Sequence, residues 1–240
     1  MLRSAAILLP ALLSTSCVIS INGWDEYDFQ HDESLEVGPW SDHGVVVESA
    51  FGDIRIEPTA GPNTIVVTLH EKHAGDARAS FEDGHLVVTT ASGDGSAVGN
   101  VLILSNGPLP SARIKSGMGD VELVGVPVEG RIELFTGMGD VLLQDTSTPG
   151  RVTMATGMGE VTVRNVECDR IEAASGMGDV DAAWLTADKA ELSSGLGDVD
   201  IVDCSFGRLE ADTGLGDIDC ARTTYAHIDL DSGLGSVSTD

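Results

Sequence analysis

A short glycine motif recurs at a fixed interval through the second half of the chain. Gly-Met-Gly or Gly-Leu-Gly occurs seven times, and successive copies are 19 or 20 residues apart. The first glycines are Gly117, Gly137, Gly157, Gly176, Gly195, Gly214 and Gly233. Self-similarity at such a period is typical of solenoids and other repeat architectures. We therefore interpret residues 111–240 as seven copies of one structural unit.

Each copy contains two segments with the alternation of a half-buried strand, typified by residues 198–201 and 208–211. Alternation with period two buries one side of a strand. The residues predicted to face inward are Val121, Leu123, Val141, Leu143, Val161, Val163, Val180, Ala182, Val199, Ile201, Ile218 and Cys220 on the first strand, and Ile132, Leu134, Val152, Met154, Ile171, Ala173, Ala190, Leu192, Leu209, Ala211, Ile228 and Leu230 on the second. One unit cannot bury its inner side alone, so stacked neighbours must supply the core.

The repeats follow one another without insertions, which favours one coil per repeat over an array of hairpins. Crossovers between parallel strands are right-handed, and stacked strands lie about 4.8 Å apart. We predict an all-β fold: a right-handed parallel β-solenoid, or β-helix, of 19–20-residue repeats with an N-terminal β-strand cap region. The glycines are expected to form turns, and the Met or Leu between them to plug the corner of each coil.

The N-terminus has the pattern of an export signal. Arg3 precedes an apolar run over residues 5–13, which is too short to span a bilayer, and small residues lead into Cys17. This pattern resembles the lipobox of bacterial lipoproteins, which implies that Cys17 becomes the lipid-modified first residue of the mature chain. The match departs from that motif at Ser14, where a leucine is usual.

The segments between the signal and the repeats differ in composition. Residues 18–42 are polar and acidic without a sustained period, and we interpret them as an acidic tether. Residues 43–110 contain short β-branched runs bounded by Gly, Pro, Asn and Asp, which predicts a β-rich N-terminal cap. The domain prediction is therefore a signal peptide over 1–17, the tether, the cap and the solenoid over 111–240.

The formal net charge is −26, which disfavours nucleic acid and anionic lipid as partners. We expect no nucleic-acid binding, and contact with a membrane only through the lipid anchor. Beyond the leader, the cysteines are Cys168, Cys204 and Cys220. An odd number cannot all pair within one chain, and none lies in a Cys-x-x-Cys motif, so we interpret them as small buried apolar residues.

The Gly-[Met/Leu]-Gly-Asp-Val runs, together with the upstream segment 101–110, resemble the bacterial "putative adhesin" family of β-repeat envelope proteins. The resemblance covers roughly residues 43–240. It implies a β-helix-like solenoid, export or membrane linkage, and no assigned catalytic residues.

Stacking places repeated positions in columns, and the second strand carries two columns of opposite charge. The first contains Arg131, Arg151, Arg170, Lys189, Arg208 and His227, and the second contains Glu133, Thr153, Glu172, Glu191, Glu210 and Asp229. Opposite charges on adjacent strands stabilise a sheet, so we predict a charge-balanced structural face.

The first strand instead collects carboxylates over three consecutive coils. They belong to Asp179, Asp181, Asp198, Asp200, Asp217 and Asp219. Stacked like charges are destabilising, and Ca²⁺, which takes six to eight oxygen ligands, would relieve the repulsion. The alternative is that the first Asp of each pair caps the glycine turn through backbone amides while the second is solvated. Ca²⁺ is thus the one cofactor that we keep open.

These observations favour a non-enzymatic cell-envelope protein, an adhesin or surface interaction scaffold that presents an acidic β-solenoid. A calcium-dependent binding module is the alternative. An enzyme acting on polysaccharide is a remote alternative, because no acid–base pair can be placed in a cleft. The partner would be an envelope or surface protein or a glycan. The expected location is the outer membrane or cell surface as a lipoprotein, otherwise the periplasm.

Overall fold

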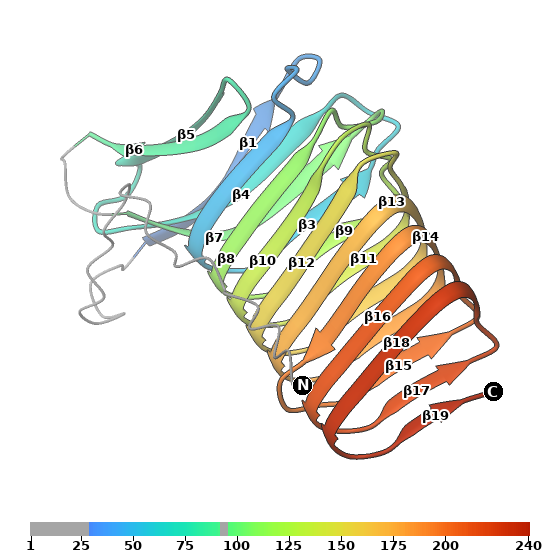
Figure 1. Ribbon diagram of the computed structural model, residues 1–240. Helices are drawn as coiled ribbons and strands as arrows, with labels where there is room; N and C mark the ends of the chain where they lie inside the picture. Colours follow the sequence, from blue (N-terminus) through green and yellow to red (C-terminus); the bar gives the residue numbers. More distant parts are fainter. Residues whose placement is uncertain (1–28, 92–95) are drawn as a thin grey trace.

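The computed structural model describes residues 29–91 and 96–240, and within these ranges every regular element is a β-strand. Figure 1 shows the strands side by side along one axis, from the N-terminal cap to the last coil. The strands are β1 Phe29–Glu36, β2 Val45–Phe51, β3 Ile54–Pro58, β4 Thr64–Glu71, β5 Ala77–Glu82, β6 His85–Thr90, β7 Ser96–Ser105, β8 Ala112–Met118, β9 Val121–Val124, β10 Ile132–Met138, β11 Val141–Ser147, β12 Arg151–Met158, β13 Val161–Met177, β14 Val180–Ser194, β15 Val199–Val202, β16 Ser205–Leu215, β17 Ile218–Ala221, β18 Thr224–Leu234 and β19 Val237–Thr239.

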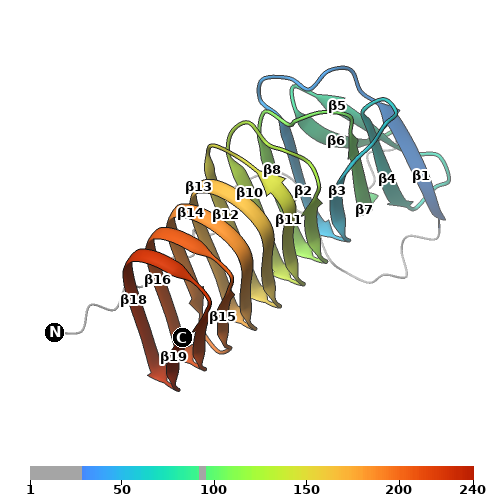
Figure 2. The same ribbon diagram turned by 90° about the vertical axis from the view of Figure 1, so that its right-hand side faces the viewer.

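Equivalent residues of successive repeats pair in parallel. Val161, for example, lies opposite Val180, which in turn lies opposite Val199. Because each strand pairs with its own counterpart one repeat later, the chain forms one coil per repeat, as the stack in Figure 2 shows. The predicted all-β parallel solenoid is therefore confirmed.

Each coil has three sides. Along β13, buried and outward side chains alternate except at Arg164–Asn165 and Asp169–Arg170, where two consecutive residues face outward. These interruptions are corners, and the glycine motif forms the remaining corner. The sequence predicted the sides that carry the two alternating strands, but not the short third side between them.

The core is a set of apolar columns along the solenoid axis. The predicted inward residues are buried in every coil except the last, where Ile228 and Leu230 are half-buried. The third side adds buried residues such as Val166, Leu185 and Phe206. The three cysteines are free and also buried, which confirms their interpretation as small apolar residues; they are Cys168, Cys204 and Cys220.

One corner is built from a column of left-handed residues. Asp145, Asn165, Trp184, Asp203 and Arg222 have φ angles between 49° and 56°. Such angles are uncommon outside glycine and cost about 1–2 kcal/mol per residue, so the stacked neighbours must hold them in place. Asn165 Nδ2 donates to Asp145 Oδ1 at 2.6 Å, and the Arg222 guanidinium bonds both Asp203 oxygens at 2.8 and 3.0 Å.

Parallel stacking begins upstream of residue 111. Strand β2 pairs with β8, so that Ser49 lies opposite Ser116 and Phe51 opposite Met118. Strand β3 pairs with β9 in the same way. Ser49-Ala50-Phe51-Gly52-Asp53 thus occupies the place of the glycine motif in a first coil. Residues 59–105 are inserted between this coil and the next, and the chain then rejoins the stack, where Leu109 pairs in parallel with Val128.

The insertion and the preceding strand cover the N-terminal end of the stack. Strand β4 lies antiparallel between β1 and β7, and β7 pairs with β3. Strands β5 and β6 form a hairpin (Figure 1), and β6 also pairs with β2, where Val46 lies opposite His85. Strand β1 lies in the segment interpreted as a tether; it is largely polar, and backbone pairing with β4 defines it as a strand.

Within the described ranges, no helix has the length and apolar character needed to cross a membrane. The predicted signal peptide over 1–17 and its Cys17 lie outside the described residues.

Candidate functional site

The glycine corner presents its central side chain to solvent. The exposed fractions are 40% for Met138, 41% for Met158, 47% for Met177, 49% for Leu196, 47% for Leu215 and 72% for Leu234. The expectation that these residues plug the corner is wrong, because the flanking valines and isoleucines already fill the coil. We call the column of Met118, Met138, Met158, Met177, Leu196, Leu215 and Leu234 the Met/Leu ridge. The glycines on both sides of each residue were the sequence signal for an outward position.

The glycines permit close stacking of backbone at this corner. A Cβ on Gly159, where φ is +141°, would lie 2.1 Å from the carbonyl oxygen of Gly139 in the preceding coil. The hydroxyl before each motif, buried in every copy except the last, completes the contact. Thr156 Oγ1 donates to the Gly139 carbonyl, and Ser175 Oγ to that of Gly159, both at 2.8 Å. The backbone beneath the Met/Leu ridge is therefore held in place by close stacking and by hydrogen bonds between coils.

The first Asp of each repeat joins its coil to the next one. The backbone N–H of Asp198 donates to Asp179 Oδ1 at 2.9 Å, and that of Asp217 donates to Asp198 Oδ1 at 2.7 Å. The Ser236 amide and hydroxyl both donate to Asp217 Oδ1 and hold the pKa of Asp217 below its usual value. These carboxylates bond backbone amides, as in the capping interpretation, although each amide belongs to the following coil.

The second Asp of each pair forms an adjacent column. Asp181, Asp200 and Asp219 lie opposite one another on neighbouring strands. Burial, together with the nearby Glu160 carboxylate, raises the pKa of Asp181 to about 6. Burial and then Asp219 also raise the pKa of Asp200. This column therefore accumulates negative charge that no basic side chain opposite it offsets.

The six predicted calcium ligands thus occupy two parallel columns along the stack. In the part of the chain that the structure describes, no group of three or more His, Cys, Asp or Glu side chains is arranged to hold a metal ion. Calcium binding stays a prediction.

The predicted charge-balanced face is confirmed on the second strand of the repeats. Arg151 lies 3.2 Å from Glu172 in the next coil, and Arg170 lies 3.7 Å from Glu191. Farther along, Arg208 Nη2 donates to Glu210 Oε1 at 2.7 Å. Exposed pairs contribute only about 0–1 kcal/mol each, so their main effect is to fix the register between coils.

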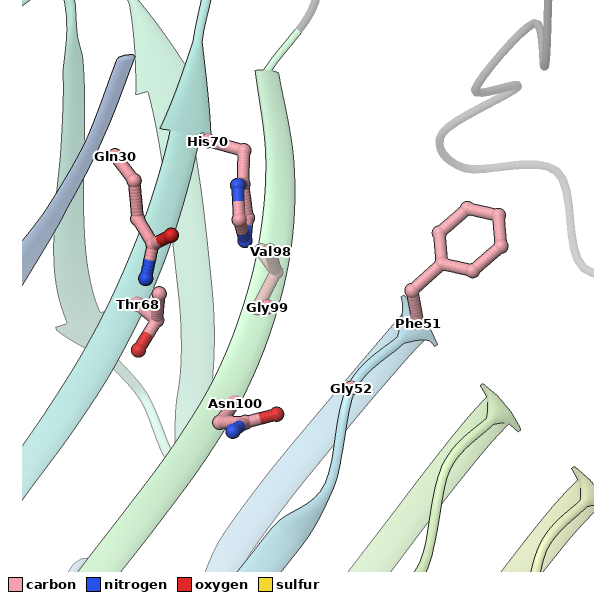
Figure 3. A pocket seen from close by; sticks show the side chains of 8 residues that line it. All are labelled: Gln30, Phe51, Gly52, Thr68, His70, Val98, Gly99 and Asn100. Atoms are coloured by element: carbon pink, nitrogen blue, oxygen red, sulfur yellow. The ribbon is translucent and has the colours of Figure 1, made fainter. Parts of the chain in front are cut away.

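A shallow pocket of about 190 Å³ lies where the cap meets the first coil (Figure 3). Figure 3 shows Gln30, Thr68 and His70 on one side of it, and the Phe51 ring projecting away from the ribbon. Asn100 Oδ1 accepts the Asp53 backbone N–H at 3.0 Å, as the first Asp of each repeat accepts an N–H of the following coil. The lining residues contain no pair of carboxylates for glycoside hydrolysis.

Comparison with solved structures shows the same architecture in bacterial proteins. A structure from Bacteroides fragilis, described as a "putative adhesin", has 16% identity and a TM-score of 0.59; the match covers 90% of this chain and 99% of that one. A "putative adhesin" from Parabacteroides merdae has 11% identity, a TM-score of 0.53 and coverages of 88% and 96%. A "putative lipid binding protein" from Parabacteroides distasonis has 14% identity, a TM-score of 0.52 and coverages of 88% and 94%.

At these identities the likeness shows the fold alone. The family model described as Toastrack DUF4097 matches residues 45–240. This match begins at the first residue of β2, where parallel stacking also begins. A search of curated proteins gives no match.

Proposed function

The chain belongs to the Toastrack DUF4097 family, and we propose that it is a non-enzymatic cell-envelope protein whose solenoid serves as a surface interaction scaffold. The observation that carries this proposal is the uninterrupted stack of coils. Its polar side chains bond mainly to neighbouring coils, and its outward columns run the length of the solenoid. Extended solenoid faces are frequent binding surfaces. The names of the structural neighbours from Bacteroides and Parabacteroides support a role at the surface.

The location is tested by adding protease to intact cells that carry an epitope-tagged protein. We expect digestion, or digestion after the outer membrane is opened, while a cytoplasmic marker stays intact. A protein recovered only with the cytoplasmic marker would contradict the proposal.

The anchor is tested by the mass of the mature N-terminus. We propose that this residue is a lipid-modified Cys17, and that Cys17→Ser releases the protein from the membrane fraction. An unmodified N-terminal residue other than Cys17 would overturn the lipid anchor but not the scaffold.

The scaffold role is tested by cross-linking on intact cells. We expect the wild-type protein to be recovered with a defined envelope protein or glycan. Recovery of the monomer alone at every cross-linker length would contradict the role.

A calcium-dependent module is a second candidate, supported by the stacked carboxylates and the raised pKa values of Asp181 and Asp200. A cation beside this column would offset the repulsion. Millimolar Ca²⁺ should then raise the melting temperature relative to EDTA, and a variant with Asp181→Asn and Asp200→Asn should lose the response. An unchanged melting temperature in Ca²⁺ would remove this candidate.

A further inference from the structure

We propose that the Met/Leu ridge and its acidic flanks form a docking surface for a cationic amphipathic helix of a partner protein. The proposal rests on the scaffold function and names the kind of partner that this scaffold takes. The ridge is unusual because large apolar side chains on a soluble surface are normally scattered singly, whereas these are stacked in one line.

The ridge has the length of a short helix. Coils about 4.8 Å apart place Met138 and Leu234, five coils apart, about 24 Å from each other. A helix of about 16 residues has this length at 1.5 Å per residue. Its apolar residues recur about every 5.4 Å along the axis, close to the spacing of the ridge. Unbranched methionine adapts readily to such a partner.

Carboxylates flank the ridge on both sides in its C-terminal half. On the first-strand side lie the two columns already described, which contain Asp198 and Asp200 in one coil. On the other side, Asp212 lies opposite Asp231 in the next coil. Burial raises the pKa of Asp212, and the neighbouring Asp231 carboxylate adds to this effect. A partner that buries the leucines therefore has to bring positive charge on both sides of its apolar stripe.

The same charges disfavour the other occupants of an apolar surface. A second copy of this chain would place identical carboxylates opposite these ones, and an anionic lipid surface would meet the same repulsion. The basic side chains nearest in the repeat are paired with glutamates on the second-strand face, as Arg208 is with Glu210. A helix with leucines on one face and lysines beside them satisfies both the apolar and the electrostatic requirement.

The probe is a synthetic 16-residue peptide of leucine and lysine, with leucines at helical spacing and a fluorophore at one end. Its matched control replaces every leucine by glutamine and keeps the charge. Anisotropy titrations at about 0.15 M salt, where exposed charges are screened beyond about 8 Å, compare the two peptides on the purified protein. We expect the leucine peptide to bind about tenfold or more tightly than its control.

The matched protein variants separate the ridge from other apolar surface. The triple variant Met177→Ser, Leu196→Ser and Leu215→Ser should bind the leucine peptide about tenfold more weakly or worse. Trp184→Asn changes a side chain that is 60% exposed at the left-handed corner, where Asn165 is the stacked equivalent, and should leave affinity unchanged. Circular dichroism and a melting curve establish that the triple variant is folded.

Equal binding of the two peptides, or an unaffected triple variant, would overturn the proposal, because charge alone would then explain the association. The proposal also fails if the wild-type protein self-associates in sedimentation, or floats with anionic vesicles, and the triple substitution abolishes that behaviour. The ridge would then bind a second copy of the chain or a lipid surface. Cross-linking on cells distinguishes this failure from that of the scaffold. Partners captured equally by wild type and triple variant leave the scaffold standing and remove the ridge from it.

Discussion

The close backbone stacking at the glycine corner predicts a large effect of Gly159→Ala. The added Cβ would lie 2.1 Å from the Gly139 carbonyl oxygen and 2.6 Å from its carbon, and φ at this position is +141°. Backbone in this region is essentially restricted to glycine and costs about 1–3 kcal/mol for other residues. Relief of the contact requires the two coils to move apart.

Separation of the coils weakens hydrogen bonds between them. The Gly139 N–H donates to the Met158 carbonyl at 2.9 Å, immediately before the substituted residue. Loss of one or two such bonds adds about 1–2 kcal/mol, so we expect destabilisation by about 2–5 kcal/mol in total. For a chain of this size that corresponds to a fall of about 10 °C in melting temperature, measured by calorimetry.

Gly107→Ala is the matched control. A Cβ at Gly107 meets nothing within 4 Å, and its backbone is not in the positive-φ region. We expect its melting temperature to stay within about 2 °C of the wild-type value. If Gly159→Ala is no more destabilising than Gly107→Ala, the stacking argument is refuted.

Three further predictions follow from ionisable groups. Because the pKa of Asp181 in the folded protein is raised to about 6, its ionisation lowers stability above that pH and has no effect below 3.8. Asp181→Asn should therefore stabilise the protein by about 1 kcal/mol at pH 7, where solvent screens part of the repulsion, and should not stabilise it at pH 3.5. Urea titrations at the two pH values measure this difference. Burial opposes ionisation of Glu71, but the N–H groups of Ala77 and Gly75 and the nearby His31 hold its pKa below 4.5. The ionised carboxylate therefore stabilises the fold above pH 4.5, and this stabilisation is lost on further acidification. Glu71→Gln should cost about 1–3 kcal/mol at pH 7, and a variant as stable as the wild type would contradict this. Burial raises the pKa of the Cys168 thiol to about 12, so a maleimide should label this residue only after unfolding, and rapid labelling of native protein would contradict its placement in the core.

The sequence sufficed to predict the core because the same positions are buried in one coil after another, up to the last. Alternation in each strand identified the inward residues, and the constant interval implied parallel stacking. The same column argument predicted the ladder of Arg151, Glu172 and their equivalents, since charge at a stacked position repeats with the coil. These features depend on periodicity, which one sequence is enough to reveal.

Other features were not predictable because they carry no repeated residue type. The left-handed corner is occupied by Asp145, Asn165, Trp184, Asp203 and Arg222. Aspartate and asparagine tolerate this conformation locally, whereas Trp184 and Arg222 depend on stacking to hold it. No glycine pattern marks that corner, and the short third side beside it went unrecognised.

The first coil was concealed for a different reason. Ala50 stands where later repeats have the first glycine, and about fifty inserted residues separate this coil from the next. The Cβ of Ala50 is tolerated because the close contact involves the Cβ position of the equivalent residue in the next coil. A Cβ on that residue, Gly117, would lie 2.5 Å from the Ala50 carbonyl oxygen.

The outward direction of the glycine corner is the central claim, and methionine oxidation tests it most directly. Met138, Met158 and Met177 are 40–47% exposed, whereas Met154, four residues before Met158, is 1% exposed in the core. Limited treatment of the native protein with hydrogen peroxide, followed by peptide mass spectrometry, should convert the three ridge methionines to sulfoxides and leave Met154 intact until the protein is unfolded. Protection of the ridge methionines, or oxidation of Met154 at the same rate in the native protein, would contradict the account.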